Sequence, residues 1–435
     1  MIFYFCRDAR HDASVCHPSQ AHAMKCFDAR QLTELARQYG SPLWVYHADT
    51  IRRRIAELKR FDVIRYAQKA NSNIHILSLM REQGVKVDAV SLGEIERALA
   101  AGYKADSTKP SDIVFTADVL DRATLERVAA AGIAVNAGSI DMLRQLGAAS
   151  PGHRVWLRVN PGFGHGHSQK TNTGGENSKH GIWHEQVSDA LEVIRQFGLH
   201  LVGLHMHIGS GVDYGHLQQV CGAMVKLATE LGHDIEAISA GGGLSIPYRD
   251  SDARIDTAHY FELWDEARRR IAAHLGHPVR LEIEPGRFLV AESGALISEV
   301  RAVKTMGSRR FVLVDAGFND LMRPAMYGSH HDISVLGADG TEKSGERAPC
   351  VVAGPLCESG DVFTQQEGGL VESRPLPDAQ VGDLLVFHDA GAYGATMSSN
   401  YNSRPLLAEA LIDGSSSRLI RRRQTMAELL ELERV

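Results

Sequence analysis

The chain has 435 residues with a formal net charge of −6, and 23% of its residues are charged. It is longer than one (β/α)₈ barrel, which takes about 250 residues, so a second domain is expected. The negative charge excludes a bulk attraction to nucleic acid or to anionic membranes, and no apolar run approaches the roughly 20 residues that span a bilayer. We therefore expect no nucleic-acid or membrane partner.

The first residues carry no helical or strand periodicity. Residues 1–23 contain three histidines, and the apolar start at Met1 is too short for a signal peptide. We expect residues 1–26 to form a disordered or misannotated extension, with Met24 as a candidate start. The six cysteines form no Cys-x-x-Cys pair, which argues against a zinc site and for a reducing cytoplasm.

Short β-rich runs then alternate with helical stretches, a pattern that predicts a parallel sheet. Eight such units favour a closed (β/α)₈ TIM-type barrel, with an open doubly wound sheet of fewer strands as the alternative. The runs cover residues 63–67, 85–90, 113–116, 133–136, 154–160, 201–208, 235–240 and 280–284.

After Glu284 the alternation stops. Strand-like runs at 296–303, 311–314, 349–352 and 384–387 are separated by Gly-, Pro- and Asp-rich turns, with little helix before Leu406 and the last fifteen residues. The sequence therefore predicts an α/β barrel over residues 49–294 and an all-β, Greek-key-like domain over 295–435. We expect residues 27–48 to associate with the β domain.

Polar residues and glycines stand where the predicted barrel strands end, which is where barrels place their active sites. Lys69 follows the first strand and Asp88 lies in the second, while His207 and Ser210 end the sixth. Gly241, Gly242 and Gly243 follow the seventh, and Glu284, Pro285, Gly286 and Arg287 end the eighth. Each has a structural reading when taken alone: a salt-bridged lysine, a buried histidine, a tight turn or an ion pair at the barrel mouth.

In combination these residues suit a phosphorylated aldehyde. The Lys69 amine can form a Schiff base with an aldehyde. Glycines let backbone N–H groups approach phosphate oxygens, and loops seven and eight of a barrel commonly bind phosphate. A carboxylate at Glu284 can keep a pyridine nitrogen protonated, and His207 can stack on the ring. The pattern predicts a site for pyridoxal 5′-phosphate.

The same motifs resemble the alanine-racemase-fold pyridoxal-phosphate enzymes and, within them, the enterobacterial diaminopimelate decarboxylases. The resemblance covers the chain from about residue 27 onward. The motif that best separates diaminopimelate from other substrates is the stretch from Asn319 to Tyr327. The other matching stretches are residues 66–70, 207–210, 241–243, 284–287, 357–361 and 391–394.

The resemblance implies a role for each matching residue. Lys69 would hold the cofactor as an imine, and Glu284 would contact its ring nitrogen. Around the phosphate would lie Ser210, Gly241 to Gly243, Gly286, Arg287 and Tyr393. The distal carboxylate of meso-diaminopimelate would meet Arg287, Arg323 and Tyr327, and its distal ammonium would meet Glu358. Cys357 would donate the proton, and Cys357 and Glu358 would enter from a second subunit, which implies a homodimer.

Other functions stay open at this point. A sister enzyme could act on arginine, ornithine or carboxynorspermidine, or could be an amino-acid racemase, although no second base is evident. The substrates of decarboxylases that form diamines have no distal carboxylate for Arg323 to bind. The charge of Arg323 would then be buried and unpaired, which is costly. A non-catalytic binding protein would be expected to lack Lys69 or Cys357. A sugar-phosphate aldolase using Lys69 does not account for the β domain.

Overall fold

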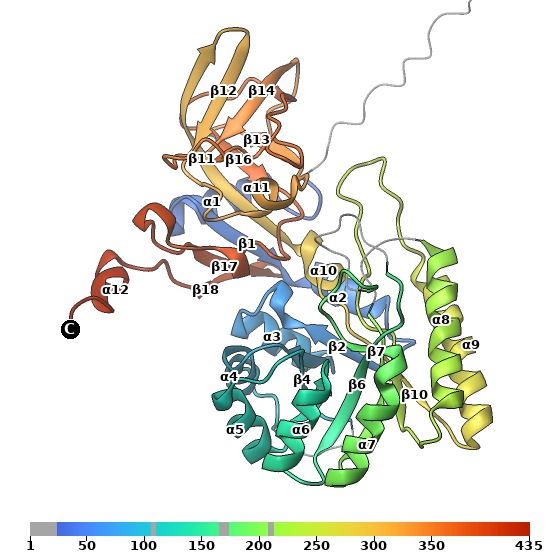
Figure 1. The fold of residues 1–435 in the computed structure, drawn as a ribbon. Helices are drawn as coiled ribbons and strands as arrows, with labels where there is room; N and C mark the ends of the chain where they lie inside the picture. The colour runs from blue at the N-terminus through green and yellow to red at the C-terminus, as the bar shows by residue number, and fades with distance from the viewer. Residues whose placement is uncertain (1–23, 106–109, 165–173, 208–212) are drawn as a thin grey trace, which may run out of the picture.

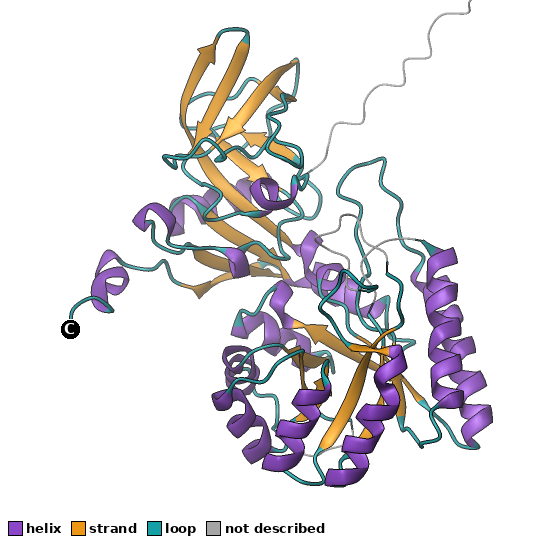
Figure 2. Cartoon of the chain, viewed as in Figure 1, coloured by secondary structure: helices purple, strands orange, loops and turns teal. Residues whose placement is uncertain are grey.

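The computed structural model describes residues 24–105, 110–164, 174–207 and 213–435, so Ser210 lies outside the described residues. A barrel surrounded by helices forms one body, and a second, mostly β body lies against its rim (Figures 1 and 2). None of the helices in these described ranges is long and apolar enough to cross a membrane.

Eight parallel strands close into a barrel, because β10 hydrogen-bonds to β2 and β5 hydrogen-bonds to β6. This confirms the predicted barrel and is incompatible with an open sheet. The short strand β7 (Ile182–Trp183) extends the edge along β6. The barrel strands are β2 (Val63–Ala67), β3 (Lys86–Ala89), β4 (Ile113–Ala117), β5 (Ala134–Ala137), β6 (Arg154–Asn160), β8 (His200–His205), β9 (Ala237–Ser239) and β10 (Arg280–Ile283).

A helix follows nearly every strand and covers the outside of the barrel (Figure 2). Side-chain caps at Ser91, Asp121 and Ser139 accept the first free backbone N–H groups of their helices. Such caps mark where each strand-to-helix connection ends. The barrel helices are α2 (Ala48–Ala56), α3 (Ile74–Glu82), α4 (Leu92–Ala100), α5 (Arg122–Ala131), α6 (Ile140–Ala149), α7 (Val187–Phe197), α8 (Tyr214–Glu230), α9 (Thr257–Leu275) and α10 (Arg287–Val290).

An ion pair joins the two strands that close the barrel. Arg65 of β2 donates from Nε and Nη2 to one Glu282 oxygen of β10, at 3.2 and 2.8 Å, and from Nη1 to the Ser111 carbonyl. Both side chains are 2% exposed. A buried pair of this kind is costly to break, because the remaining charge stays out of water.

We therefore expect Arg65→Ala to lower the free energy of unfolding by about 3 kcal/mol, since among the described residues Glu282 then keeps Arg280 alone, at its other oxygen. The matched control is Arg144→Ala, which breaks the exposed pair with Asp141 and should cost less than about 1 kcal/mol. Urea unfolding of the two variants measures the difference. Equal losses would contradict a structural role for the buried pair.

The second sheet has the order β15-β14-β12-β11-β1-β17-β18, and β16 joins β11 to β13. Four of its strands match the runs predicted from sequence, whereas residues after Leu406 form a hairpin rather than a helix. The strands are β1 (Leu43–His47), β11 (Gly294–Met306), β12 (Arg309–Val314), β13 (Ile333–Leu336), β14 (Arg347–Ala353), β15 (Arg374–Pro377), β16 (Leu384–Phe387), β17 (Ala408–Asp413) and β18 (Ser416–Arg421). The helices of this body are α1 (Ala29–Tyr39), α11 (Arg323–Tyr327) and α12 (Met426–Glu431).

The beginning of the described chain belongs to this second body. Strand β1 lies between β11 and β17, and α1 packs its apolar side chains on the same sheet. Met24 is 8% exposed, and Lys25 forms ion pairs with Asp332 and Asp389. The last residues of the predicted extension, 24–26, thus pack against the β body. Residues 1–23 lie outside the described residues.

Candidate active site

The carboxyl ends of the barrel strands bring the predicted residues together. Lys69 lies in a short 3₁₀ turn directly after β2, where its side chain is exposed between the buried residues Gln68 and Ala70. Ala67, two residues before Lys69, pairs in register with Asp88 of β3, and His207 follows the end of β8. Lys69 therefore lies at the same end of the barrel as Asp88 and His207.

Glu284 is held as an anion beside a histidine. His205 of β8 contacts a Glu284 oxygen through Nε2 at 2.7 Å, and the two side chains are 2% and 11% exposed. Burial alone would raise the pKa of Glu284, but His205 and Arg65 lower it below its ordinary value. The carboxylate can thus support a positive charge on a neighbouring group at neutral pH. His205 lies in the barrel interior, as its position in the strand predicts.

Burial shifts the pKa values of His207 and Asp88 in opposite directions, and in both cases it disfavours the charged form. Burial, then the charges of Arg158 and Lys69, lowers the pKa of His207 well below its usual range. Its Nδ1 accepts a hydrogen bond from Gly242 N at 3.1 Å, so this nitrogen carries a lone pair. Burial and the charge of Glu284 raise the pKa of Asp88, whose Oδ1 has no hydrogen-bond partner among the described residues.

The triple glycine passes tightly between two strand ends. A Cβ on Gly241 would lie 2.5 Å from the Met206 carbonyl oxygen, and one on Gly242 would lie 2.6 Å from that of Glu284. Gly241 also has a left-handed φ of +62°, and its carbonyl accepts from Glu284 N. Any side chain would displace the strands, so the backbone N–H groups of this loop stay uncovered by Cβ atoms.

A loop from the second body completes the mouth of the barrel. Tyr393, with a φ of +56°, donates its N–H to the Ala70 carbonyl, one residue beyond Lys69. The Asn71 side chain donates to the Gly391 carbonyl at 3.3 Å. On the barrel side, Pro285 accepts from Ala67 N and so ties the end of β10 to the end of β2. The position of Tyr393 is thus fixed relative to Lys69.

Two arginines meet around one tyrosine beside this loop. Arg287, which follows Gly286, donates to the Tyr248 hydroxyl at 2.7 Å, and its guanidinium lies 5.3 Å from the Tyr393 ring. Arg323 of α11 is 4% exposed, and its guanidinium lies 4.8 Å from the Tyr248 ring. Tyr327, at the end of α11, is half-buried. Together with Tyr248 and Tyr393 it raises the pKa of the Arg287 guanidinium, against the opposing effect of burial. No carboxylate pairs with Arg323 among the described residues.

Cys357 and Glu358 lie elsewhere in this chain. Both are exposed on the loop after β14, and no described contact joins them to the Lys69 pocket. The loop is well held, because the Asp361 carboxylate accepts from Phe318 N and Leu356 N at 2.7 and 2.8 Å. It presents the two side chains outward on a fixed backbone.

Sequence reasoning missed Tyr248 and His331. Tyr248 lies five residues after Gly243, in the loop after strand seven, and that position is a usable signal because such loops commonly line barrel sites. His331 contacts Arg323 at 3.0 Å but stands in an irregular turn before β13. No pattern in the sequence singles it out.

Comparison with known proteins agrees with this geometry. Residues 48–291 match the family model described as pyridoxal-dependent decarboxylase, pyridoxal binding domain. Diaminopimelate decarboxylase of Escherichia coli K12 is 71% identical over 408 residues, 93% of this chain and 96% of that protein. The Streptomyces coelicolor enzyme of the same name is 66% identical, over 93% of this chain and 92% of that protein.

Solved structures show the same relationship. A crystal structure of diaminopimelate decarboxylase superposes with a TM-score of 0.91 at 70% identity, covering 93% of this chain and 96% of the other. The Helicobacter pylori diaminopimelate decarboxylase complexed with L-lysine has a TM-score of 0.81 at 32% identity, covering 92% and 99%.

Together with the barrel and its strand-end residues, these matches place the chain in the family of pyridoxal-dependent decarboxylases. Within that family it belongs to the diaminopimelate decarboxylases. The described residues fit the cofactor: an exposed lysine amine, a Cβ-free glycine loop and an anionic Glu284 lie around one barrel mouth.

Proposed function

We propose that this protein removes CO₂ from the D-centre of meso-2,6-diaminopimelate and yields L-lysine, the last step of lysine biosynthesis. The observation that carries the substrate assignment is Arg323, a buried guanidinium beside Arg287 that has no carboxylate partner among the described residues. Such a charge is costly unless a ligand balances it. A planar carboxylate fits a guanidinium through two parallel hydrogen bonds.

The barrel residues would hold the cofactor and prepare it. Bound pyridoxal phosphate supplies an electron sink for the electron pair that departing CO₂ leaves behind. Lys69 would hold it covalently through Nζ, and His207 would pack on its ring as a neutral imidazole. Glu284, anionic because His205 lowers its pKa, would keep a proton on the ring nitrogen. Asp88 lies close enough to Glu284 for the charge of Glu284 to add to the effect of burial and raise the pKa of Asp88.

The phosphate would lie against the glycine loop and the end of β10. Residues 241–243 carry no Cβ, so phosphate oxygens can come close to this stretch of backbone. Arg287 supplies a positive charge there. Tyr393 is fixed beside it by the hydrogen bond from its backbone N–H to the Ala70 carbonyl. The resemblance adds Ser210 and Gly286 to this set and gives Pro285 as a further cofactor-binding residue.

The working form in this proposal is a homodimer with shared sites. The Cys357 thiol would protonate the carbon that lost CO₂, and Glu358 would bind the distal ammonium. Both would act on the site of the other subunit, which accounts for two exposed side chains on a rigid loop. The cysteine pattern supports a cytoplasmic setting.

A substrate panel tests the assignment. The purified protein is expected to release CO₂ from meso-diaminopimelate and not from ornithine, arginine, lysine or carboxynorspermidine. Comparable turnover of ornithine or arginine would reject the proposed substrate.

Arg323→Ala tests the distal subsite. We expect kcat/KM for meso-diaminopimelate to fall by about 10²-fold or more, mainly through KM, because a buried charged contact is lost. Arg309→Ala, at an exposed arginine on β12, is the matched control and should leave both constants unchanged. A fall in kcat alone would place Arg323 outside the carboxylate subsite.

A further inference from the structure

Among the described residues, His331 is the histidine whose ring nitrogen contacts the Arg323 guanidinium. It is 2% exposed in the turn between α11 and β13, and its Nε2 lies 3.0 Å from Arg323 Nη1. The Tyr248 ring, which also contacts Arg323, packs edge-on against the imidazole at 5.7 Å between centroids. Arg323 thus contacts the Tyr248 side chain and one imidazole nitrogen.

The protonation of His331 follows from its two contacts. Nδ1 lies 2.9 Å from the His388 carbonyl, which can only accept, so Nδ1 carries the hydrogen. Nε2 is left with a lone pair facing the Arg323 N–H. Burial, followed by the charge of Arg323, lowers the pKa of His331 well below its usual range, and His330 and Arg374 act in the same direction. The ring is therefore a neutral acceptor.

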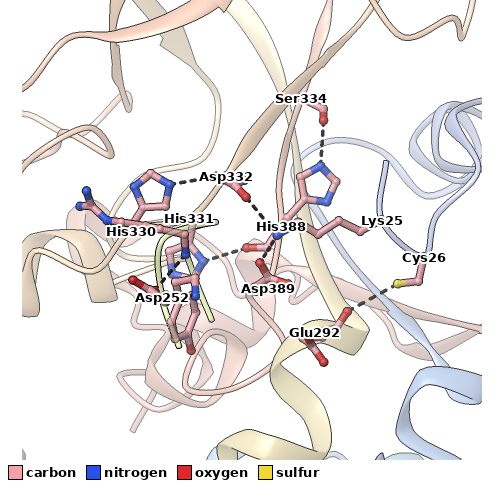
Figure 3. A network of polar contacts seen from close by, with 12 residues as sticks. Lys25, Cys26, Asp252, Glu292, His330, His331, Asp332, Ser334, His388 and Asp389 are labelled. Carbon is pink, nitrogen blue, oxygen red and sulfur yellow. Dashed lines mark hydrogen bonds and ion pairs between the residues drawn. The ribbon is translucent and has the colours of Figure 1, made fainter. Parts of the chain in front are cut away.

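The backbone around this contact is braced on both sides. His388 N donates to the Asp332 carbonyl, and β13 pairs with β16 from Ile333 and Phe387 onward. Lys25 forms ion pairs with Asp332 and Asp389, the residues that follow His331 and His388 (Figure 3). The two segments that fix the imidazole cannot move independently without breaking these contacts.

We propose that His331 is a positioning residue for the distal-carboxylate subsite and acts through Arg323. This role rests on the proposed function. A neutral acceptor fixes the direction of the guanidinium through one N–H and leaves its charge uncompensated for the incoming carboxylate. An aspartate or glutamate in its place would orient Arg323 equally well but would neutralise it and repel the substrate.

Two amide substitutions separate the two contacts of the ring. The amide of His331→Gln reaches the position of Nε2 and can still accept from Arg323. The amide of His331→Asn reaches the position of Nδ1 and keeps only the bond to the His388 carbonyl. The asparagine substitution should raise KM for meso-diaminopimelate by about 10- to 100-fold, as for the loss of a hydrogen bond to a charged group. The glutamine variant should have a KM close to that of the parent, and kcat should change little in both variants.

Two further readouts exclude a merely structural effect. In an Arg323→Ala background the asparagine substitution should raise KM no further, because His331 acts through the Arg323 guanidinium, which is already absent. Pimelate is a dicarboxylate of the same chain length, and its dissociation constant should rise together with KM. Its binding can be measured without turnover. If His331→Asn does not fold, His331→Ala, which loses both contacts, takes its place in the comparison with His331→Gln.

The outcomes distinguish the two proposals. A parent protein that releases no CO₂ from meso-diaminopimelate and does not bind pimelate overturns the proposed function and the positioning role with it. A parent that turns over the substrate, with equal KM and equal pimelate affinity in the two amide variants, overturns the role of His331 alone.

Discussion

Lys69→Ala should leave a protein without the visible absorbance of the lysine-bound cofactor and should lower decarboxylation by about 10²- to 10⁴-fold. Lys69 is the lysine that directly follows β2 at the mouth of the barrel. Without it the cofactor has only its phosphate and ring contacts, so it is bound non-covalently and lost on dialysis.

The measurement is an absorbance spectrum before and after dialysis, followed by the rate of CO₂ release. Lys304→Ala removes an exposed lysine on β11 and serves as the matched control, with the parent spectrum and rate expected. If the Lys69→Ala protein kept the parent spectrum after dialysis, another lysine would be the anchor and the site would have to be relocated.

Mixing two inactive proteins should restore activity if the sites are shared between subunits. Cys357→Ala alone should lose about 10²- to 10⁴-fold of the rate, because it removes the proton donor. In an equal mixture with Lys69→Ala, half of the dimers are mixed, and each mixed dimer has one site with both groups intact. About a quarter of the parent activity is then expected for a two-fold symmetric dimer.

The doubly substituted chain, with both Lys69→Ala and Cys357→Ala, provides the control. When it is mixed with either single variant, every site lacks Lys69, Cys357 or both, so no activity should return. If mixed dimers of the two single variants form but stay inactive, Cys357 acts within its own subunit or not at all.

The barrel and its mouth were predictable because their signals are local. A strand of a parallel barrel is buried on both faces, so it appears as a mostly apolar run such as Ile113–Ala117, and the polar residue after it marks the strand end. Lys69, Asp88, Glu284 and the glycines could be placed together on that basis alone. The cofactor class follows from their chemistry.

The second sheet was predicted less completely because its pairing is long-range. Strand β1 pairs with β11 and β17, which lie about 250 and 365 residues further along the chain, and nothing near residue 43 signals this. The sequence predicts helix at Leu406 and in the last fifteen residues. Strand β17 instead pairs with β1 and folds back on β18, and only α12 in the last fifteen residues is helical. The site residue His331 was missed for a similar reason, since its contact with Arg323 is made between irregular segments.

The most direct test of the central claim uses meso-diaminopimelate that carries a carbon label in the carboxyl group of its D-centre. The purified protein with pyridoxal phosphate should release the label as CO₂ and form an equal amount of unlabelled L-lysine. Release should stop when the cofactor is removed and resume when it is added back. Label retained in lysine, or no CO₂ from the fully loaded protein, would contradict the assignment.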